Sequence, residues 1–350
     1  MIISRTPFRI SFFGGGTDYP VWYRDHEGAV LATTINKYCH LSCRWLPPFF
    51  DYTSQVVWSK IERVKDVSEI EHPAVRETLR FLDLTQGVAL HHDGDLPART
   101  GLGSSSSFTV GLLHSLYGLK GIMPSKQQLA QEAIYIEHEL LKEHVGCQDQ
   151  VIAAYGGLNR INFSANGMFH VAPVIVEEER LARLQEHLML FFTGLSRNAS
   201  EVAKEQIRAT PQKTRELRAI YQMVDEGIEI LQGKDELAVF GRLLHESWQL
   251  KKSLTGRIST ASIDAIYEAA CRSGAIGGKL LGAGGGGFLL LFARPEDHAR
   301  IKEVLDGLLH VPFRFESSGS RVIFYEPEET PEAGSSPAGK SLSLVAGRAS

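Results

Sequence analysis

Cysteine is scarce in this chain of 350 residues, which contains only four. They are Cys39, Cys43, Cys147 and Cys271, and none forms the C-x-x-C pair found in zinc sites and redox-active thiols. Cys39 and Cys43 lie in an expected strand with His40 between them, so a zinc site there stays open beside two buried free thiols. This cysteine usage is typical of a reducing compartment, and we expect a cytoplasmic protein.

Long apolar runs and long basic runs are also missing. No stretch approaches the ~20 apolar residues of a membrane-spanning helix. Residues 1–7 do not resemble a secretory signal, because a charge and a proline interrupt them. The 37 Lys and Arg residues are balanced by 41 Asp and Glu residues, for a formal net charge of −4. Nucleic acids and anionic membranes are therefore not expected partners.

Glycine, by contrast, is abundant, and the most informative stretch is Leu96–Ser107, with the sequence LPARTGLGSSSS. Gly101 and Gly103 permit backbone conformations that a Cβ would block, and an apolar periodic run predicts a helix that begins at the serines. A glycine loop at a helix N-terminus favours anions, and serine hydroxyls can bind phosphate or Mg²⁺. No Gly-Lys-Ser/Thr ends the loop, so it is not a Walker A loop. A flexible loop with a serine helix cap is the alternative.

Two further stretches are rich in glycine. Arg9–Tyr19 reads RISFFGGGTDY, and Lys279–Phe288 reads KLLGAGGGGF. Four successive glycines, Gly284 to Gly287, cost more conformational entropy than a turn between strands requires. We therefore favour a ligand-binding role for the second stretch over a structural turn.

In this order, the three stretches resemble the motifs of a small-molecule kinase superfamily. It is named after galactokinase, homoserine kinase, mevalonate kinase and phosphomevalonate kinase (GHMP). The resemblance extends from about Ile2 to about Tyr325. Within the superfamily, the Gly-Gly-Gly-Thr-Asp sequence and Thr193–Arg197 are similar to D-glycero-D-manno-heptose 7-phosphate kinases. The resemblance implies an α+β fold of two lobes, the first like ribosomal protein S5 domain 2 and the second ferredoxin-like.

We expect the N-terminal lobe, with the ATP phosphate loop, to span residues 1–175 and the C-terminal lobe residues 176–326. Residues 327–350 are rich in Glu, Pro, Gly, Ser and Ala, a composition that predicts a disordered tail. The hydrophobic periodicity predicts a strand over 2–13 and a pair of strands over 29–35 and 38–45. The expected helices include 18–26 with Asp18 as cap, 126–143, 295–309, and 198–254 with breaks at Pro211 and Gly233.

Phosphoryl transfer depends on positioning and charge neutralisation, so it needs a phosphate cradle, a metal ligand, a base and groups that hold the acceptor. The resemblance assigns ATP binding to Arg99, Gly101, Leu102, Gly103, Ser104, Ser105, Ser106, Ser107, Gly284 and Gly285. It assigns Mg²⁺ binding to Ser105 and Glu137. The apolar neighbours of Glu137 argue against the alternative of a solvated surface glutamate.

Two charged residues match the positions of catalytic residues in the family motifs. Asp149, in Gly146-Cys-Gln-Asp-Gln150, would accept or orient the proton of the acceptor hydroxyl, and a helix cap is a compatible alternative. Arg9 would neutralise charge near the acceptor oxygen, and its alternative is a surface arginine on a strand edge.

The resemblance assigns acceptor binding to the first and third motifs, at Gly14, Gly15, Gly16, Thr17, Asp18, Gly282 and Ala283. Gly15 and Gly16 stand where galactokinases carry Glu-His, which disfavours galactose and suits a larger or anionic acceptor. Leu281 stands where a serine or threonine is usual, so a hydroxyl contact there is in doubt.

An acceptor that already carries a phosphate needs a cation near that phosphate. Ser196 and Arg197 lie between an expected strand and the next helix, so they are candidates for this pocket, with Arg99 as the second choice. A surface arginine is the alternative for each. The adenine pocket has no motif, and Trp58 is the aromatic side chain we would assign to it.

The resemblance implies transfer of a phosphoryl group from ATP to the anomeric hydroxyl of D-glycero-D-manno-heptose 7-phosphate. The product is the 1,7-bisphosphate, which feeds nucleotide-activated heptose for surface polysaccharide, and the resemblance leans to the α anomer and the GDP-linked route. Two alternatives stay open: a sugar-1-kinase for fucose, arabinose or a uronic acid, and a non-catalytic sugar and ATP sensor. The presence of Ser105, Glu137 and Asp149 argues against the sensor. The expected partners are a sugar phosphate, ATP and Mg²⁺, and the sequence leaves open whether the protein is a homodimer.

Overall fold

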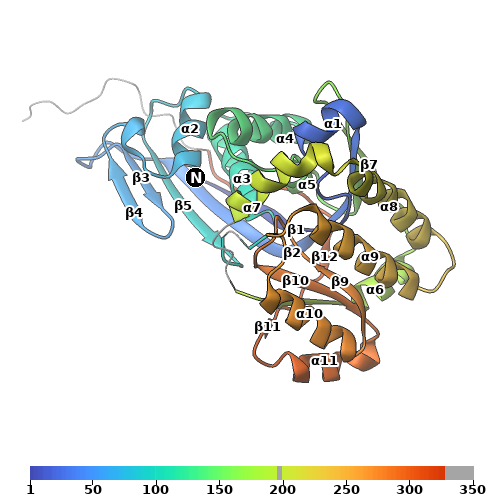
Figure 1. Ribbon diagram of the computed structural model, residues 1–350. Helices are drawn as coiled ribbons and strands as arrows, with labels where there is room; N and C mark the ends of the chain where they lie inside the picture. Colours follow the sequence, from blue (N-terminus) through green and yellow to red (C-terminus); the bar gives the residue numbers. More distant parts are fainter. Residues whose placement is uncertain (99, 195–198, 328–350) are drawn as a thin grey trace, which may run out of the picture.

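The computed structural model describes residues 1–98, 100–194 and 199–327, which form an α+β protein of two lobes (Figure 1). Each lobe has one β-sheet with helices packed against it. Arg99, Ser196, Arg197 and the expected tail from residue 328 onward lie outside the described residues, so their roles stay predictions. Among the described residues, no helix has the length and apolar character needed to cross a membrane.

The N-terminal lobe is organised around two long strands, β1 (Ile2–Phe13) and β2 (Gly28–Trp45). They pair antiparallel from Ile2, opposite Cys43, to Phe13, opposite Leu31. The described strands that complete this sheet are β3 (Ser54–Val57), β4 (Ile61–Val64), β5 (Val88–Gly94), β6 (Asn159–Phe163), β7 (Phe169–Pro173), β12 (Phe315–Glu316) and β13 (Arg321–Tyr325).

The predicted pair of strands over 29–35 and 38–45 is wrong, because both segments belong to the single strand β2. Pro7 of β1 faces Tyr38, whereas the next residue, Phe8, faces Ile35. Asn36 and Lys37 therefore form an irregularity within β2 where the sequence suggested a turn. The physical reason is that both halves of β2 pair with the same strand, β1, so the chain has no need to reverse between them.

The first motif also differs from the prediction in one detail. The expected helix over 18–26 is α1 (Pro20–His26), and its N-cap residue is Tyr19, not Asp18. The Asp18 carboxylate instead accepts hydrogen bonds from the backbone N–H groups of Gly16 and Gln148, at 2.9 and 3.4 Å. Asp18 therefore joins two loops and does not cap the helix.

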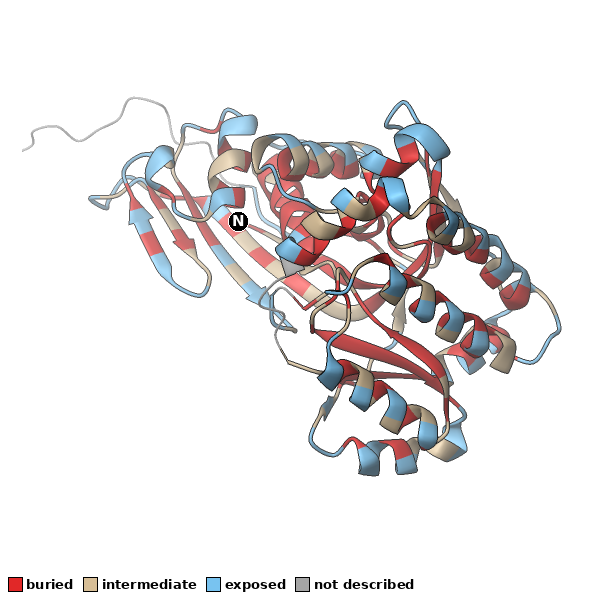
Figure 2. Cartoon of the chain, in the orientation of Figure 1, coloured by how far each residue is buried: buried red, intermediate tan, exposed pale blue. Residues whose placement is uncertain are grey.

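Helix α3 (Ser104–Leu119) follows the serine-rich loop and packs against β1 and β2 at the centre of the lobe. Its residues from Ser106 to Tyr117 are all buried, which fits a helix without a polar face. The short elements η1 (Val67–Glu69), α2 (Pro73–Phe81), α4 (Lys126–Tyr135) and α5 (Gln148–Tyr155) complete this layer. Figure 2 shows the buried residues of the helices on the sides that face the sheets.

The expected helix over 126–143 is shorter than predicted. Helix α4 ends at Tyr135 and continues as a π-helical turn, η2 (Ile136–Leu140), which contains Glu137. Single π-helical turns within helices are often found at functional sites. Here the turn coincides with one of the two predicted metal ligands.

The C-terminal lobe has a four-stranded antiparallel sheet in the described residues, in the order β11-β8-β10-β9. Its strands are β8 (Leu188–Phe192), β9 (Ala275–Leu280), β10 (Phe288–Ala293) and β11 (Leu309–His310). Its helices are α6 (Glu178–Glu186), α7 (Ala199–Ala209), η3 (Thr210–Gln212), α8 (Thr214–Gln232), α9 (Ala238–Leu254), α10 (Ala261–Arg272), η4 (Pro295–Asp297) and α11 (His298–Val304). The breaks in the 198–254 helical region confirm the prediction, whereas the helix expected over 295–309 is η4 followed by the short α11.

The two lobes are joined by more than one crossing of the chain. After β11, the strands β12 and β13 return to the first sheet, where they pair with β2 and β1. Helix α8 also contacts β1 and β2. The limits of 1–175 and 176–326 stay a prediction, and the return of the chain ties the last strands to the first lobe.

Candidate active site

Residues from both lobes line a cavity of about 420 Å³. They come from β1 and the turn after it, from the serine-rich loop, from the start of α5, and from α7, α9 and β9. The predicted site residues among them are Arg9, Gly15, Gly16, Asp18, Gly101, Gly103, Ser104, Ser105, Ser106, Asp149, Gly282 and Ala283. The fold thus brings parts of all three glycine-rich motifs to one place.

Arg9 and Asp149 form a bidentate salt bridge in this cavity. Arg9 Nε donates to Asp149 Oδ1 at 2.7 Å, and Arg9 Nη2 donates to Asp149 Oδ2 at 2.8 Å. Arg9 Nη1 donates to the carbonyl oxygen of Gly101 at 2.6 Å. The arginine side chain is nearly buried, whereas 22% of the Asp149 side chain is exposed to the cavity. The guanidinium therefore fixes the orientation of a carboxylate that a ligand can reach.

The serine-rich loop and the third motif pack directly against each other. A methyl group on Gly101 would lie 2.4 Å from the Leu281 carbonyl oxygen, and one on Gly287 would lie 2.3 Å from the Thr100 carbonyl oxygen. Both glycines have positive φ values, +82° and +111°. The two loops can meet because these positions carry no side chain.

Ser106, not Ser105, contacts the predicted metal ligand Glu137. Ser106 Oγ donates to Glu137 Oε2 at 2.9 Å, and Gln150 Nε2 donates to the same oxygen at 2.5 Å. Glu137 is fully buried, and its Oε1 has no hydrogen-bond partner in the described part of the chain. Burial, and then the nearby Glu143 carboxylate, raise the pKa of Glu137 to about 8. Ser105 is exposed and lines the cavity.

Asp18 follows the Gly15–Gly16 turn, near the C-terminal end of the first motif, Arg9–Tyr19. It is almost fully buried, and burial raises the pKa of its carboxyl group. A methyl group on Gly146 would lie 1.8 Å from Asp18 Oδ2, so the glycine permits the loop before Asp149 to reach this carboxylate. Asp18 therefore couples the first motif to the segment that carries Asp149.

Several predicted site residues do not line the cavity, and two of them make hydrogen bonds that stabilise the fold. Thr17 Oγ1 lies 2.8 Å from the carbonyl oxygens of both Gly14 and Ala29, which closes the turn after β1. Ser107 Oγ donates to the Pro7 carbonyl oxygen at 2.9 Å. The predicted residues that do not line the cavity are Gly14, Thr17, Leu102, Ser107, Glu137, Gly284 and Gly285.

Two buried lysines that are not among the predicted site residues, Lys251 and Lys279, also line the cavity. Lys251 Nζ donates to the carbonyl oxygen of Gly282, and Lys279 Nζ donates to that of Phe12 at 2.8 Å. Burial, and then the nearby Arg9, lower the pKa of Lys251 to about 8. Burial also lowers the pKa of Lys279.

A signal for Lys251 was present in the sequence. Lys251 continues the apolar stripe of α9 that includes Leu244, Trp248 and Leu254, all of them buried. A lysine at a core position of an amphipathic helix is unusual without a partner or a ligand. A lysine at a core position of the helical pattern could therefore have identified Lys251 as a candidate site residue.

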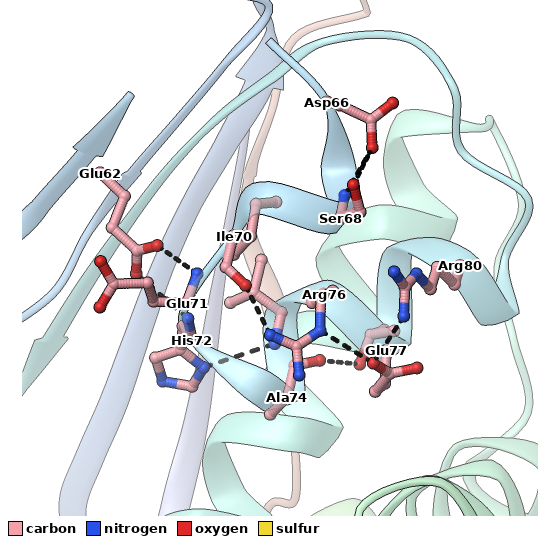
Figure 3. Close-up of polar contacts among 12 residues, drawn as sticks. Glu62, Asp66, Ser68, Ile70, Glu71, His72, Ala74, Arg76, Glu77 and Arg80 are labelled. Atoms are coloured by element: carbon pink, nitrogen blue, oxygen red, sulfur yellow. Dashed lines mark hydrogen bonds and ion pairs between the residues drawn. The ribbon is translucent and has the colours of Figure 1, made fainter. Parts of the chain in front are cut away.

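An aromatic cluster flanks the start of α3 on the side of the small strands β3 and β4. The His72 ring stacks on Phe108 with centroids 4.8 Å apart, and Trp58 packs edge-on against His72 at 4.9 Å. Figure 3 shows Glu62 beside His72, and Glu62 accepts a hydrogen bond from Trp58 Nε1 at 2.8 Å. Trp58 is thus held in place beside α3, and its assignment to adenine stays a prediction.

Two family models match the chain. "GHMP kinases N terminal domain" covers residues 67–157, and "GHMP kinases C terminal" covers residues 234–308. The chain belongs to the GHMP kinase superfamily. This GHMP kinase is an ATP-dependent phosphotransferase, and members of the superfamily use ATP and Mg²⁺.

Named relatives and solved structures agree with this assignment. The GHMP kinase is 26% identical to "D-glycero-alpha-D-manno-heptose 7-phosphate kinase" of Campylobacter jejuni, over 84% of this chain and 90% of the relative. It is 25% identical to the "Bifunctional fucokinase/GDP-fucose pyrophosphorylase" of Arabidopsis thaliana, over 84% of this chain but only 30% of that longer protein.

The structural comparison confirms the predicted two-lobed GHMP kinase fold. A crystal structure named as a D-glycero-D-manno-heptose 1-phosphate kinase of Bacteroides thetaiotaomicron superposes with a TM-score of 0.77 and 22% identity. That match covers 93% of this chain and 100% of the other. A mevalonate kinase structure superposes with a TM-score of 0.69 and 19% identity, over 90% of this chain and 99% of the other.

Proposed function

We propose that this kinase phosphorylates the anomeric hydroxyl of D-glycero-D-manno-heptose 7-phosphate, giving the 1,7-bisphosphate and ADP. The observation that carries the proposal is the position of the Arg9–Asp149 pair. It lines one cavity together with the serine-rich loop and the Gly15–Gly16 turn. The name of the Campylobacter jejuni relative supplies the sugar.

Asp149 is the base in this proposal. Its carboxylate accepts the proton of the C1 hydroxyl while the oxygen attacks the γ-phosphorus of ATP, and ADP leaves. Arg9 holds the carboxylate in place and offers positive charge near the reacting oxygen. The N-terminus of α3 and the backbone of Gly103 and Ser104 cradle the phosphates of ATP.

Glu137 and the serine-rich loop fit a magnesium site. One buried oxygen of Glu137 is bonded by Ser106 and Gln150, whereas the other has no partner among the described residues, which suits a hard-cation ligand. Glu137 would hold the ion with Ser105 or Ser106. When bound, Mg²⁺ would neutralise the charge of the ATP phosphates.

The 7-phosphate of the acceptor requires cations. Lys251 and Lys279 line the cavity, and their ammonium groups are bonded only to carbonyl oxygens in the described part of the chain. They support an anionic acceptor, because a phosphate offers a buried ammonium group a stronger partner than a neutral carbonyl. Ser196 and Arg197 stay predicted for the same role.

A second candidate function is phosphorylation of an uncharged deoxy sugar such as fucose. The observation that favours it is the match to the plant fucokinase, which covers the same share of this chain as the match to the heptose kinase. Gly15 and Gly16 leave room for either acceptor.

Release of ADP, measured with a panel of sugars, tests the proposal. The panel holds heptose 7-phosphate, unphosphorylated heptose, fucose, arabinose and a uronic acid at matched concentrations. We expect the highest kcat/KM for the phosphorylated heptose, with the new phosphate on C1 by ³¹P NMR. A higher kcat/KM for fucose than for heptose 7-phosphate would favour the second candidate function over the first.

A further inference from the structure

Three buried polar side chains that no predicted role includes lie around the Gly15–Gly16 turn. They are Ser11 on β1, Gln148 at the start of α5 and Gln206 on α7, and all three line the cavity. Their exposed fractions are 6%, 9% and 3%. Ser11 Oγ, Gln148 Oε1 and Gln206 Oε1 have no hydrogen-bond partner in the part of the chain that the structure describes.

The positions of these three side chains show that they surround one place. A methyl group on Gly15 would lie 3.9 Å from both Ser11 Oγ and Gln148 Nε2. A methyl group on Gly16 would lie 2.8 Å from Gln206 Nε2. The three therefore come from separate elements of both lobes and meet around a turn that has no side chains of its own.

A buried polar atom without a partner destabilises a fold, so three of them in one cavity wall require an explanation. All three groups are neutral. The two amide oxygens can only accept, whereas the serine hydroxyl can donate or accept, so sugar hydroxyl groups, which do both, can pair with all three. A carboxylate or a fully ionised phosphate has no proton to donate, so it could not pair with the two amide oxygens.

We propose that Ser11, Gln148 and Gln206 bind hydroxyl groups of the sugar acceptor and set its specificity. This inference rests on the proposed function, since it takes the acceptor to be a sugar. Asp18 extends the same surface, because its carboxylate accepts a hydrogen bond from the Gln148 backbone N–H. The uncharged, hydroxyl-rich part of the acceptor lies against this surface, and any phosphate lies toward the lysines.

The test compares Ser11→Ala and Gln206→Met with the wild-type enzyme on the best acceptor of the sugar panel. We expect KM for the acceptor to rise about three- to tenfold in each variant, with KM for ATP unchanged. The melting temperature without ligand should stay equal or rise, because neither change removes a hydrogen bond of the folded protein. A merely structural role would lower it.

Ser4→Ala is the matched control. Ser4 is a buried serine on the same strand β1, but its Oγ donates to the Gly111 carbonyl oxygen at 2.9 Å. This variant should lose thermal stability and keep the acceptor KM. Opposite responses of two serines on one strand would separate ligand binding from folding.

Acceptors that each lack one hydroxyl complete the test. The deoxy acceptor that lacks the hydroxyl bound by Ser11 should bind the wild-type enzyme more weakly than the parent sugar. Ser11→Ala should not weaken the binding of that deoxy acceptor further, because the same hydrogen bond is already missing. Unchanged KM values and unchanged deoxy selectivity in both variants would overturn the inference while the heptose assignment stands. If fucose is the best acceptor, the heptose assignment fails, and the same variants test the inference with fucose. If no sugar is accepted, both fail.

Discussion

Gly101 and Gly282 lie so close together that a methyl group on Gly282 would be 2.4 Å from the Gly101 Cα. One belongs to the serine-rich loop and the other to the glycine-rich stretch between β9 and β10. Gly282 also has a φ of +74°, a conformation that other residues adopt only with strain. Two motifs that are far apart in the sequence thus meet in the wall of the cavity.

Gly282→Ala should therefore disturb ATP binding and lower stability. The methyl group would collide with backbone that cannot move aside, and the left-handed conformation alone costs about 1–2 kcal/mol. We expect a lower melting temperature and a raised KM for ATP. Gly307→Ala is the control, because nothing lies within 4 Å of its Cβ position. Equal behaviour of the two variants would show that the loops do not need this contact.

The glycine motifs could be found from the sequence because their signal is local. A run of glycines, or glycines before a serine-capped helix, restricts the backbone in a way that neighbouring residues reveal. Lys251 shows a weaker local signal, its place on an apolar stripe. Ser11 and Gln206 show none, because their role depends on strands and helices that meet only in the folded protein.

The two predicted magnesium ligands illustrate the same limit. The motif assigns Ser105, but helical geometry turns Ser106 toward Glu137, which lies on the π-helical turn η2. The sequence gives no sign of that turn, since residues 126–143 have one continuous helical pattern. Which serine faces Glu137 depends on where the helices lie relative to each other.

Asp149→Asn should lower kcat by at least about 100-fold, because the amide cannot accept the proton of the acceptor hydroxyl. ATP binding should persist, since backbone N–H groups of the serine-rich loop and the N-terminus of α3, and not the Asp149 carboxylate, would hold the phosphates. Some stability should also be lost, because Arg9 is nearly buried and loses its charged partner. Kinetics, ATP titration and thermal melting check these outcomes.

Asp225→Asn is the control for the loss of an ion pair. Asp225 pairs with Arg160 on the surface, and 53% of its side chain is exposed, so little stability should be lost. If Asp149→Asn retains turnover within a few-fold of the wild-type enzyme, Asp149 is not the base.

Glu137→Gln should raise the Mg²⁺ concentration needed for half-maximal activity and leave the acceptor KM nearly unchanged. The reason is the loss of an anionic oxygen from a site that suits a hard cation. Glu139→Gln makes the same substitution on the same turn, but Glu139 is exposed and pairs with Lys142. A Mg²⁺ titration that shifts equally in both variants would remove Glu137 from the metal site.

The pH dependence of the reaction should reflect Lys251. Its pKa is lowered to about 8 by burial, so kcat/KM for an anionic acceptor should fall as the pH rises through about 8 and the positive charge is lost. Stability should move the other way. The unfolded lysine titrates near 10.5, so the folded state binds fewer protons between these values, and this group's contribution to stability improves as the pH rises from 8 to 10.5.

Lys251→Arg keeps its charge at these pH values, so the fall in kcat/KM near pH 8 should be absent in that variant. Activity profiles and melting temperatures over pH 6.5 to 10, taken on the same samples, separate the two effects (roughly the range that brackets a pKa of 8). An identical alkaline fall in the wild-type enzyme and in Lys251→Arg would assign the titration to another group.

The residue that binds the acceptor phosphate can be identified by selectivity between acceptors. Arg197 is the prediction from the sequence, and Lys251 is one of the two buried lysines that line the cavity. A charge-assisted bond to a phosphate oxygen contributes about 1.5–3 kcal/mol, or roughly ten- to a hundredfold in affinity. Whichever residue binds the phosphate, its replacement should raise KM for heptose 7-phosphate by this factor and barely change KM for unphosphorylated heptose.

Arg197→Ala and Lys251→Met are therefore compared on both acceptors. A selective loss in Arg197→Ala alone would confirm the prediction from the sequence, and Arg197→Lys should then recover only part, because a point charge replaces a planar fork. A selective loss in Lys251→Met alone would place the phosphate beside the Gly282 carbonyl oxygen, which Lys251 contacts. Equal loss on both acceptors indicates damage to the fold or to the reaction centre, since only a bond to the phosphate distinguishes the two sugars. If neither variant changes the ratio, the phosphate pocket lies elsewhere, and Arg99 is the next residue to replace.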